Sequence, residues 1–307
     1  MRSITVAVHS LGNIGGHVID SLCAAPDFTC LGVIRRASSL GANPRALRGM
    51  QDFPSFDSLA AQKGKPDVAI LCSPSRAVPE TALEYLAKGV RTVDSFDIHN
   101  EIVPLVQQLD PVAKKTGSAA ITAAGWDPGT DSVMRALFEA MAPVGTTFTN
   151  FGRGRSMGHS VAARAIAGVT DASSITIPIG GGRHARLVYL LLEEGADFAK
   201  VKDDLAKDPY FAHDPLDVKQ VFSKAELASV ADNSHGVFME RVGASGNTSN
   251  QRLTFDMRID NPALTAQVLV SCARAVMRMA PGCYTLIDVP PVALLPGERM
   301  EHIGRLV

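Results

Sequence analysis

The sequence contains no apolar run approaching 18 residues, roughly the length that a membrane-spanning helix requires. It enters a strand-like segment directly after Met1, without the charged and then apolar segments of a signal peptide. We therefore expect neither membrane insertion nor export, and we expect a cytoplasmic protein.

Neither sign of charge dominates, because 30 basic and 31 acidic residues are interspersed along the chain. This balance argues against a nucleic-acid partner and against binding to a membrane surface. Cysteine is also scarce, and its spacing fits neither a metal site nor a disulfide framework. We expect no metal, and reduced cysteines in the core at positions 23, 30, 72, 272 and 283.

Tryptophan occurs once, and the stretch around Trp126 organises the rest of the chain. The apolar run 118–121 predicts a buried strand, and apolar periodicity predicts a helix over 130–141. Glycines and a proline between them shape a turn that holds Trp126 and Asp127 beyond the carboxyl end of the strand, where open α/β sheets bind ligands. The alternative is a tight turn with a capping Asp and a Trp that fills the core.

The N-terminal segment predicts a strand over 4–8, a glycine loop, and a helix over 17–24. Such a crossing directs free N–H groups and the positive end of the helix dipole at a phosphate. Ser10 stands where the usual G-x-G-x-x-G pattern has its first glycine. The residues expected to bind the pyrophosphate are Gly12, Asn13, Ile14 and Gly15.

A second strand over 29–34 ends in Arg35 and Arg36, where an NAD enzyme usually places an acidic residue for the ribose 2′-hydroxyl. Two arginines favour a 2′-phosphate, so we expect NADP as the cofactor. The alternative is a solvated pair of arginines at a strand end.

Strands over 68–72 and 91–94 alternate with helices, which predicts an α/β fold with a Rossmann-like, doubly wound parallel sheet. Asp97 and Asp127 then leave strand ends at the same edge as the glycine loop. Two carboxylates there would suit an ammonium group. The loop expected to bind the cofactor at this edge consists of Cys72, Ser73, Pro74 and Ser75.

The sequence pattern changes after residue 141. Strand-like segments rich in Thr, Val and Arg there predict a second, α+β domain with a mixed sheet. The glycine-dense loop 151–160 suggests a ligand loop, although a plain connection is the alternative. Histidines with Arg186 suggest carboxylate binding. The helix expected over 263–279 packs back on the first domain, and the tail 284–294 predicts one more strand.

The sequence resembles the meso-diaminopimelate dehydrogenase family over nearly its whole length, in particular its branch of broader specificity. The resemblance lies in the stretches 92–99, 125–132, 156–160, 235–236 and 260–267. It implies an NADP-dependent homodimer that deaminates the D-centre of a diamino dicarboxylate to L-2-amino-6-oxopimelate and ammonia. It also implies a dinucleotide-binding domain over 1–125, completed by 263–307, and a substrate-binding and dimerisation domain over 126–262.

The resemblance also implies roles for individual residues that bind this small-molecule amino-acid substrate. Asp97, Trp126 and Asp127 would hold the D-centre, and Phe151 and Met157 would form walls of the pocket. The base is left open among Asp97, Asp127 and His159. The groups that would hold the distant L-centre are Thr176, Arg186, His235 and Asn261.

Departures from the family pattern occur at Ser10, at Arg153 and Arg155, and in the stretch 247–250. If either of the two arginines enters the pocket, it should favour a substrate with a further carboxylate. Activity on another D-amino acid or 2-keto acid is thus one alternative. A non-catalytic NADP-binding protein is another.

Overall fold

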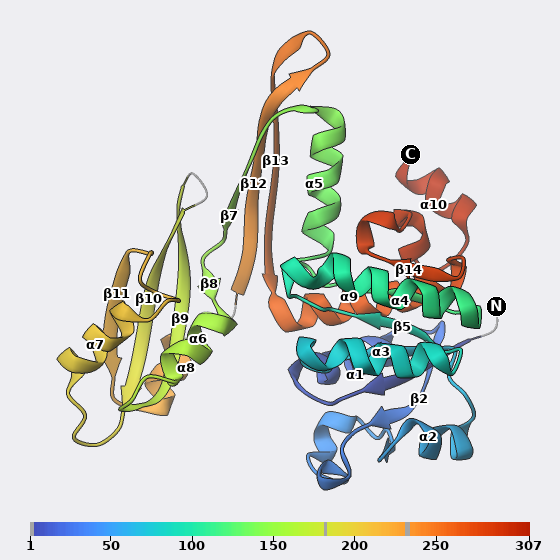
Figure 1. The fold of residues 1–307 in the computed structure, drawn as a ribbon, viewed down its shortest axis with the longest axis horizontal. Helices are drawn as coiled ribbons and strands as arrows, with labels where there is room; N and C mark the ends of the chain where they lie inside the picture. Colours follow the sequence, from blue (N-terminus) through green and yellow to red (C-terminus); the bar gives the residue numbers. More distant parts are fainter. Residues whose placement is uncertain (1–2, 181–182, 231–233) are drawn as a thin grey trace. The chain divides into compact units, whose positions relative to one another are not determined.

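The computed structural model describes residues 3–180, 183–230 and 234–307. The chain forms two compact units (Figure 1): Met1–Ala136 with Pro262–Val307, and Leu137–Asn261. The division falls inside a helix after Ala136, whereas the sequence suggested 125/126. The Trp126 turn therefore belongs to the first unit.

The first unit contains a seven-stranded sheet whose pairings are all parallel. Its strand order is β14-β6-β5-β4-β1-β2-β3, so the order reverses direction between β1 and β4. The predicted Rossmann-like sheet is confirmed. Its strands are β1 (Ile4–His9), β2 (Phe28–Ile34), β3 (Asp52–Phe53), β4 (Val68–Leu71), β5 (Arg91–Asp94), β6 (Ala119–Ile121) and β14 (Gly282–Tyr284).

Helices cover both faces of this sheet, which explains why its central strands are largely apolar (Figure 1). Successive side chains of a strand point to opposite faces. Val6 and Val8 thus join a core with α1 and α9, whereas Ala7 joins a core with α2, α3 and α4. The helices are α1 (Asn13–Ala24), α2 (Phe56–Lys63), α3 (Val78–Ala87), α4 (Ile102–Thr116), α5 (Thr130–Met141), α9 (Asn261–Ala275) and α10 (Arg299–Leu306).

Three expectations for the first unit are wrong in detail. Helix α1 begins at Asn13 rather than residue 17, because Gly15 and Gly16 are accommodated within its first turns. The tail forms a strand only over 282–284; beyond it, Pro290 and Pro291, which lack N–H donors, lie among 3₁₀ turns. Cys23 is exposed and is not a core residue, although all five cysteines are free.

The second unit contains two sheets. A four-stranded mixed sheet has the order β11-β10-β9-β8, and a three-stranded antiparallel sheet has the order β13-β12-β7. The predicted mixed-sheet domain is confirmed. The elements are β7 (Val144–Phe151), β8 (Gly154–Arg155), α6 (Met157–Arg164), β9 (Val169–Gly180), β10 (Arg183–Leu192), α7 (Phe198–Lys207), β11 (Leu216–Val221), α8 (Lys224–Val230), β12 (Ser234–Ser245) and β13 (Thr248–Asp260).

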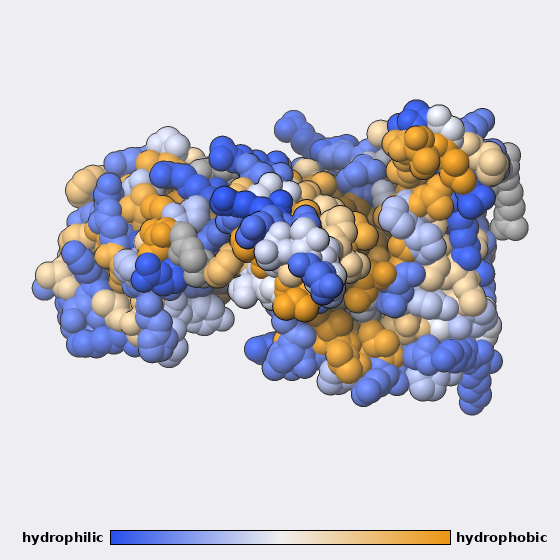
Figure 2. All heavy atoms as spheres, turned by 90° about the horizontal axis from the view of Figure 1, so that it is seen from above, coloured by the Kyte–Doolittle hydropathy of each residue, from blue (hydrophilic) through white to orange (hydrophobic). Residues whose placement is uncertain are grey.

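On the face shown in Figure 2, hydrophilic side chains are interspersed with patches of hydrophobic ones. Among the helices of the described ranges, none combines the length and the apolar character needed to cross a membrane.

Candidate active site

The β1-to-α1 crossing leaves an open, uncapped helix N-terminus. Gly12 precedes α1 without a side-chain cap, and the first turn carries no acidic residue. A Cβ on Gly15 would lie 2.6 Å from the Ser10 carbonyl oxygen, whereas a Cβ on Gly12 would meet no atom within 4 Å. Ser10 itself takes a φ of 77°, which explains why a glycine is usual there. The crossing, with Asn13 and Ile14 in the first turn of α1, fits a bound anion.

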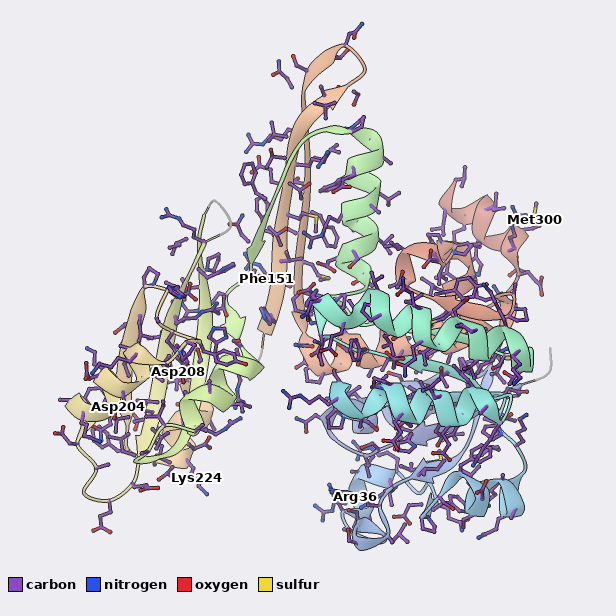
Figure 3. The ribbon with its side chains drawn as sticks, in the orientation of Figure 1. Arg36, Phe151, Asp204, Asp208, Lys224 and Met300 are labelled. Carbon is purple, nitrogen blue, oxygen red and sulfur yellow. The ribbon has the colours of Figure 1, made fainter. Side chains whose placement is uncertain are left out.

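The two arginines after β2 differ in their surroundings. The Arg35 side chain is only 8% exposed; its Nη1 donates to the Ala42 carbonyl oxygen at 2.9 Å and lies 3.4 Å from the Asp52 carboxylate. Its Nη2 donates to the Ser39 carbonyl oxygen. Arg36 is exposed beside the same loop (Figure 3). Arg35 therefore organises the loop, and Arg36 is the guanidinium that faces solvent.

The loops after β4 and β5 are joined by a side-chain hydrogen bond. The Ser75 hydroxyl donates to the Asp97 carboxylate at 2.6 Å. Burial raises the pKa of the Cys72 thiol to about 12, so this residue is a neutral packing group. Ser73 and Pro74 connect it to the 3₁₀ turn that begins at Ser75. The predicted loop thus lies beside Asp97, next to the point where the strand order reverses.

Asp94 connects the strand ends that carry Asp97 and the Trp126 turn. It is fully buried, and its Oδ1 accepts hydrogen bonds from Phe96 N, Thr122 Oγ1 and Ala123 N at 3.0, 2.8 and 3.2 Å. Its Oδ2 has no partner among the described residues. Burial raises the pKa of Asp94 to about 6 despite these hydrogen bonds. Asp94 therefore positions both loops, a role that the sequence reasoning missed.

The turn after β6 is closed by backbone contacts. Gly125 N donates to the Pro128 carbonyl oxygen at 3.0 Å. A Cβ on Gly129, whose φ is 145°, would lie 1.9 Å from the Gly125 carbonyl oxygen. Only glycine therefore fits at position 129. Trp126 is 6% exposed, so the indole is buried as in the core-filling alternative, while Asp127 is half-buried at the turn.

Asp127 lies within interaction range of a second carboxylate, that of Asp131, the second residue of α5. Burial, followed by the Asp131 charge, raises the pKa of Asp127, while His99 and Arg135 act against this shift. Asp131 is fully buried and paired with Arg135 at 2.8 Å. Asp127 is therefore the carboxylate whose environment best suits a base that takes up and releases a proton near neutral pH.

In the second unit, Arg186 on β10 is held by two side chains. Its Nε donates to Asp214 Oδ2 and its Nη1 to Thr176 Oγ1, both at 2.6 Å. Burial and then the Arg186 charge lower the pKa of both His159 and His184. Two histidines whose pKa is lowered thus lie within electrostatic range of a partly desolvated ion pair. Arg186 and Thr176 are together as expected, His184 is one of the two histidines that the sequence suggested beside Arg186, and Asp214 is an addition to the site.

Phe151 lies at the end of β7 (Figure 3). Its ring centroid is 5.6 Å from that of His184 and 6.3 Å from that of His235. His184 Nε2 accepts a hydrogen bond from Phe151 N at 2.9 Å. The second unit therefore brings Phe151, His184 and His235 together.

The remaining candidates are placed as follows. His159 belongs to the second unit, where it hydrogen-bonds Ser156 at 2.8 Å and packs against Tyr210 and Phe211. Asn261 is the first residue of α9. Met157 begins α6, and its side chain lies outside the described residues.

The two arginines of the loop before α6 differ in exposure. Arg153 is exposed, and the buried Arg155 Nε has no hydrogen-bond partner in the part of the chain described. That at least one of them reaches the substrate or the nicotinamide-side phosphates stays a prediction.

Comparison with known proteins decides the family. The model of the diaminopimelic acid dehydrogenase C-terminal domain matches residues 125–182. The meso-diaminopimelate D-dehydrogenase of Bacteroides fragilis is 50% identical over 307 residues, which is 100% of both chains. This chain belongs to the meso-diaminopimelate dehydrogenase family. As a member of that family it is an oxidoreductase acting on a CH–NH₂ group of a small molecule, with a nicotinamide cofactor.

Solved structures of this dehydrogenase family agree with the fold. The Corynebacterium glutamicum DAP dehydrogenase in complex with DAP is 27% identical, with a TM-score of 0.85 and 100% of both chains covered. An engineered D-amino acid dehydrogenase bound to NADP+ is 26% identical, with a TM-score of 0.80, over 99% of this chain and 100% of the other.

Sequence reasoning missed several residues of the site for different reasons. Asp131 is the second residue of α5, whereas Asp127 lies in the turn before that helix, so helical periodicity does not relate the two carboxylates. Asp214 gave no local signal, because it reaches Arg186 only through the pairing of β10 with β11.

Proposed function

We propose that the chain catalyses the reversible, NADP-dependent oxidative deamination of meso-2,6-diaminopimelate at its D-centre, giving L-2-amino-6-oxopimelate and ammonia. The observation that carries the proposal is the placement of Asp97 and Asp127 after the neighbouring strands β5 and β6. Two carboxylates at adjacent strand ends suit the substrate's reacting ammonium group. Full-length identity of 50% to a meso-diaminopimelate D-dehydrogenase supports this substrate.

The residues around α1 and β2 fit NADP. The uncapped N-terminus of α1 and the open space at Gly12 suit a pyrophosphate, and the exposed Arg36 suits a 2′-phosphate. When bound, NADP would supply the hydride acceptor for the D-configured carbon. Asp97 binds the ammonium group, and the buried Trp126 limits access of water.

Asp127 takes the role of base in this proposal. It accepts a proton from the ammonium group, so the nitrogen lone pair can form the imine as the hydride departs. Water then adds to the imine carbon, and loss of ammonia leaves the ketone. Asp131 raises the pKa of Asp127 and so keeps it able to exchange a proton near neutral pH.

The far end of the substrate binds at Arg186 in this proposal. A guanidinium recognises a carboxylate through paired N–H groups, and Thr176 and Asp214 hold it in one orientation. Phe151, with His184 and His235 beside it, supplies an apolar wall for the carbon chain.

A homodimer is part of the proposal. One face of the three-stranded sheet exposes apolar side chains at Val144, Phe148, Phe238 and Val242. Such a face favours burial against a second copy. Sedimentation velocity of the wild type and of Phe238→Glu tests this: a dimer that dissociates in the variant supports it, and a monomeric wild type contradicts it.

The decisive experiment measures absorbance of reduced nicotinamide with meso-diaminopimelate and a panel of D-amino acids, each with NADP and with NAD. The reverse reaction is assayed with 2-keto acids and ammonia. We expect the highest kcat/KM with meso-diaminopimelate and NADP. A higher kcat/KM with another D-amino acid would refute meso-diaminopimelate as the substrate. NADP binding without turnover of any compound would indicate a non-catalytic protein.

A further inference from the structure

The ion pair between Arg186 and Asp214 leaves unused hydrogen-bonding groups on both partners. A guanidinium has five N–H donors. Nε binds Asp214 and one Nη1 hydrogen binds Thr176, so three N–H groups remain without a partner among the described residues. Asp214 uses Oδ2 for Arg186, and no described residue donates to its Oδ1. One pair thus offers donors and an acceptor side by side.

The pair is also only partly desolvated. The side chain of Arg186 is 12% exposed and that of Asp214 is 25% exposed, so both are reachable from solvent while most of each is covered. The nearby histidines do not add positive charge, because burial lowers the pKa of both His159 and His184. The local charge is therefore that of a neutral pair, one cation beside one anion.

A neutral pair is a poor receptor for a lone carboxylate. A carboxylate bound at Arg186 would lie beside the Asp214 carboxylate, and two like charges in a partly desolvated place repel each other. An amino acid end instead carries an ammonium and a carboxylate on one carbon, with the nitrogen and the carboxyl carbon about 2.5 Å apart. Its charges complement the pair, anion against Arg186 and cation against Asp214.

We propose that Asp214 is a specificity-determining residue that receives the distant ammonium group, so that Arg186 and Asp214 together recognise a zwitterionic substrate end. This inference rests on the proposed function, in which the far end of the substrate binds at Arg186. It adds that an amino group is required at both ends of the substrate, and it assigns the second requirement to Asp214.

The test compares meso-diaminopimelate with D-2-aminopimelate, which has the same carbon chain and distant carboxylate but lacks the distant ammonium. The variants are Asp214→Asn, which keeps an acceptor for Arg186 but loses the charge, and Asp214→Glu, which keeps the charge. Asp217→Asn is the matched control, because Asp217 lies on β11 of the same sheet with a 66% exposed side chain. Melting temperatures check that each variant folds.

We expect Asp214→Asn to lower kcat/KM for meso-diaminopimelate about ten- to hundredfold, the loss of one charged hydrogen bond, mainly through KM. The value for D-2-aminopimelate should stay the same or rise, and Asp214→Glu should retain part of the preference. An equal fall for both compounds would make Asp214 only a support for Arg186, and no change would exclude it from recognition; either result overturns the inference. A wild type inactive on meso-diaminopimelate would instead refute the proposed function, and this inference with it.

Discussion

Replacing Arg36 by alanine should weaken NADP binding and leave NAD binding unchanged. Arg36 is the exposed guanidinium after β2, and the proposal assigns to it the 2′-phosphate that only NADP carries. A charged hydrogen bond contributes about 1.5 to 3 kcal/mol. Because solvent screens an exposed side chain, the lower end applies, and NADP affinity should fall about tenfold.

Arg35→Ala is the matched comparison, because the adjacent Arg35 side chain binds groups of the loop rather than facing solvent. It would remove the contacts to the Ser39 and Ala42 carbonyl oxygens and the ion pair with Asp52, whose carboxylate would keep only its hydrogen bond from Gly41 N at 2.9 Å. Loss of each such hydrogen bond costs about 0.5 to 1.5 kcal/mol. We therefore expect a lower melting temperature for Arg35→Ala and weaker binding of both cofactors.

Titration calorimetry with NADP and NAD, at low and at high salt, separates these outcomes. The NADP affinity of the wild type should fall toward that of Arg36→Ala as salt rises. Unchanged selectivity in Arg36→Ala would refute the assignment of the 2′-phosphate. A loss of selectivity without loss of stability in Arg35→Ala would refute the division of roles between the two residues.

Three further variants test the site. Asp131→Asn should shift the acidic limb of the kcat/KM profile to lower pH, because it removes the charge that helps raise the pKa of Asp127, the proposed base; an unmoved limb would argue against Asp127 as base. The wild type should lose stability as pH rises from 3.8 through about 6, because the pKa of Asp94 is higher in the folded than in the unfolded state. Asp94→Asn lacks this titration, so its melting temperature should rise relative to that of the wild type over the same pH range. A difference in melting temperature that is constant with pH would contradict the raised pKa. Gly15→Ala should abolish cofactor binding, measured by calorimetry, because the added Cβ meets the Ser10 carbonyl oxygen at 2.6 Å; normal affinity would exclude a close approach of the backbone.

The parts of the fold that the sequence predicted are those with a strong local pattern. Helix α5 has the predicted bounds, because an apolar period of 3.6 residues begins directly after the Gly129 turn. Strand β4 is apolar at every position, which is typical of a parallel strand covered on both faces. Strand β11 was missed because its alternation is interrupted by polar residues and it pairs with a single neighbour.

The candidate site was likewise predictable only where a local sequence pattern placed its residues. The strand ends place Asp97 and Asp127 at one edge of the sheet from sequence order alone. Which neighbours they interact with was not predictable, because the Ser75 hydroxyl reaches Asp97 across two loops that are 22 residues apart. Arg35 and Arg36 are adjacent and have the same side chain, so the sequence does not distinguish them. The fold buries the side chain of Arg35 and leaves that of Arg36 exposed.

Two acidic residues outside the expected site, Asp131 and Asp214, act on functional groups in opposite ways. Asp131 lies within interaction range of another carboxylate, so its charge destabilises the ionised form of Asp127 and raises the pKa of Asp127. Asp214 lies against a cation, so its charge reduces the attraction of Arg186 for a lone carboxylate. In the proposed function, the first effect would adjust proton transfer and the second would adjust the choice of substrate. Chemistry and selectivity in this chain are thus expected to respond to separate substitutions, with Asp131→Asn moving the pH profile and Asp214→Asn moving the ratio of kcat/KM between substrates.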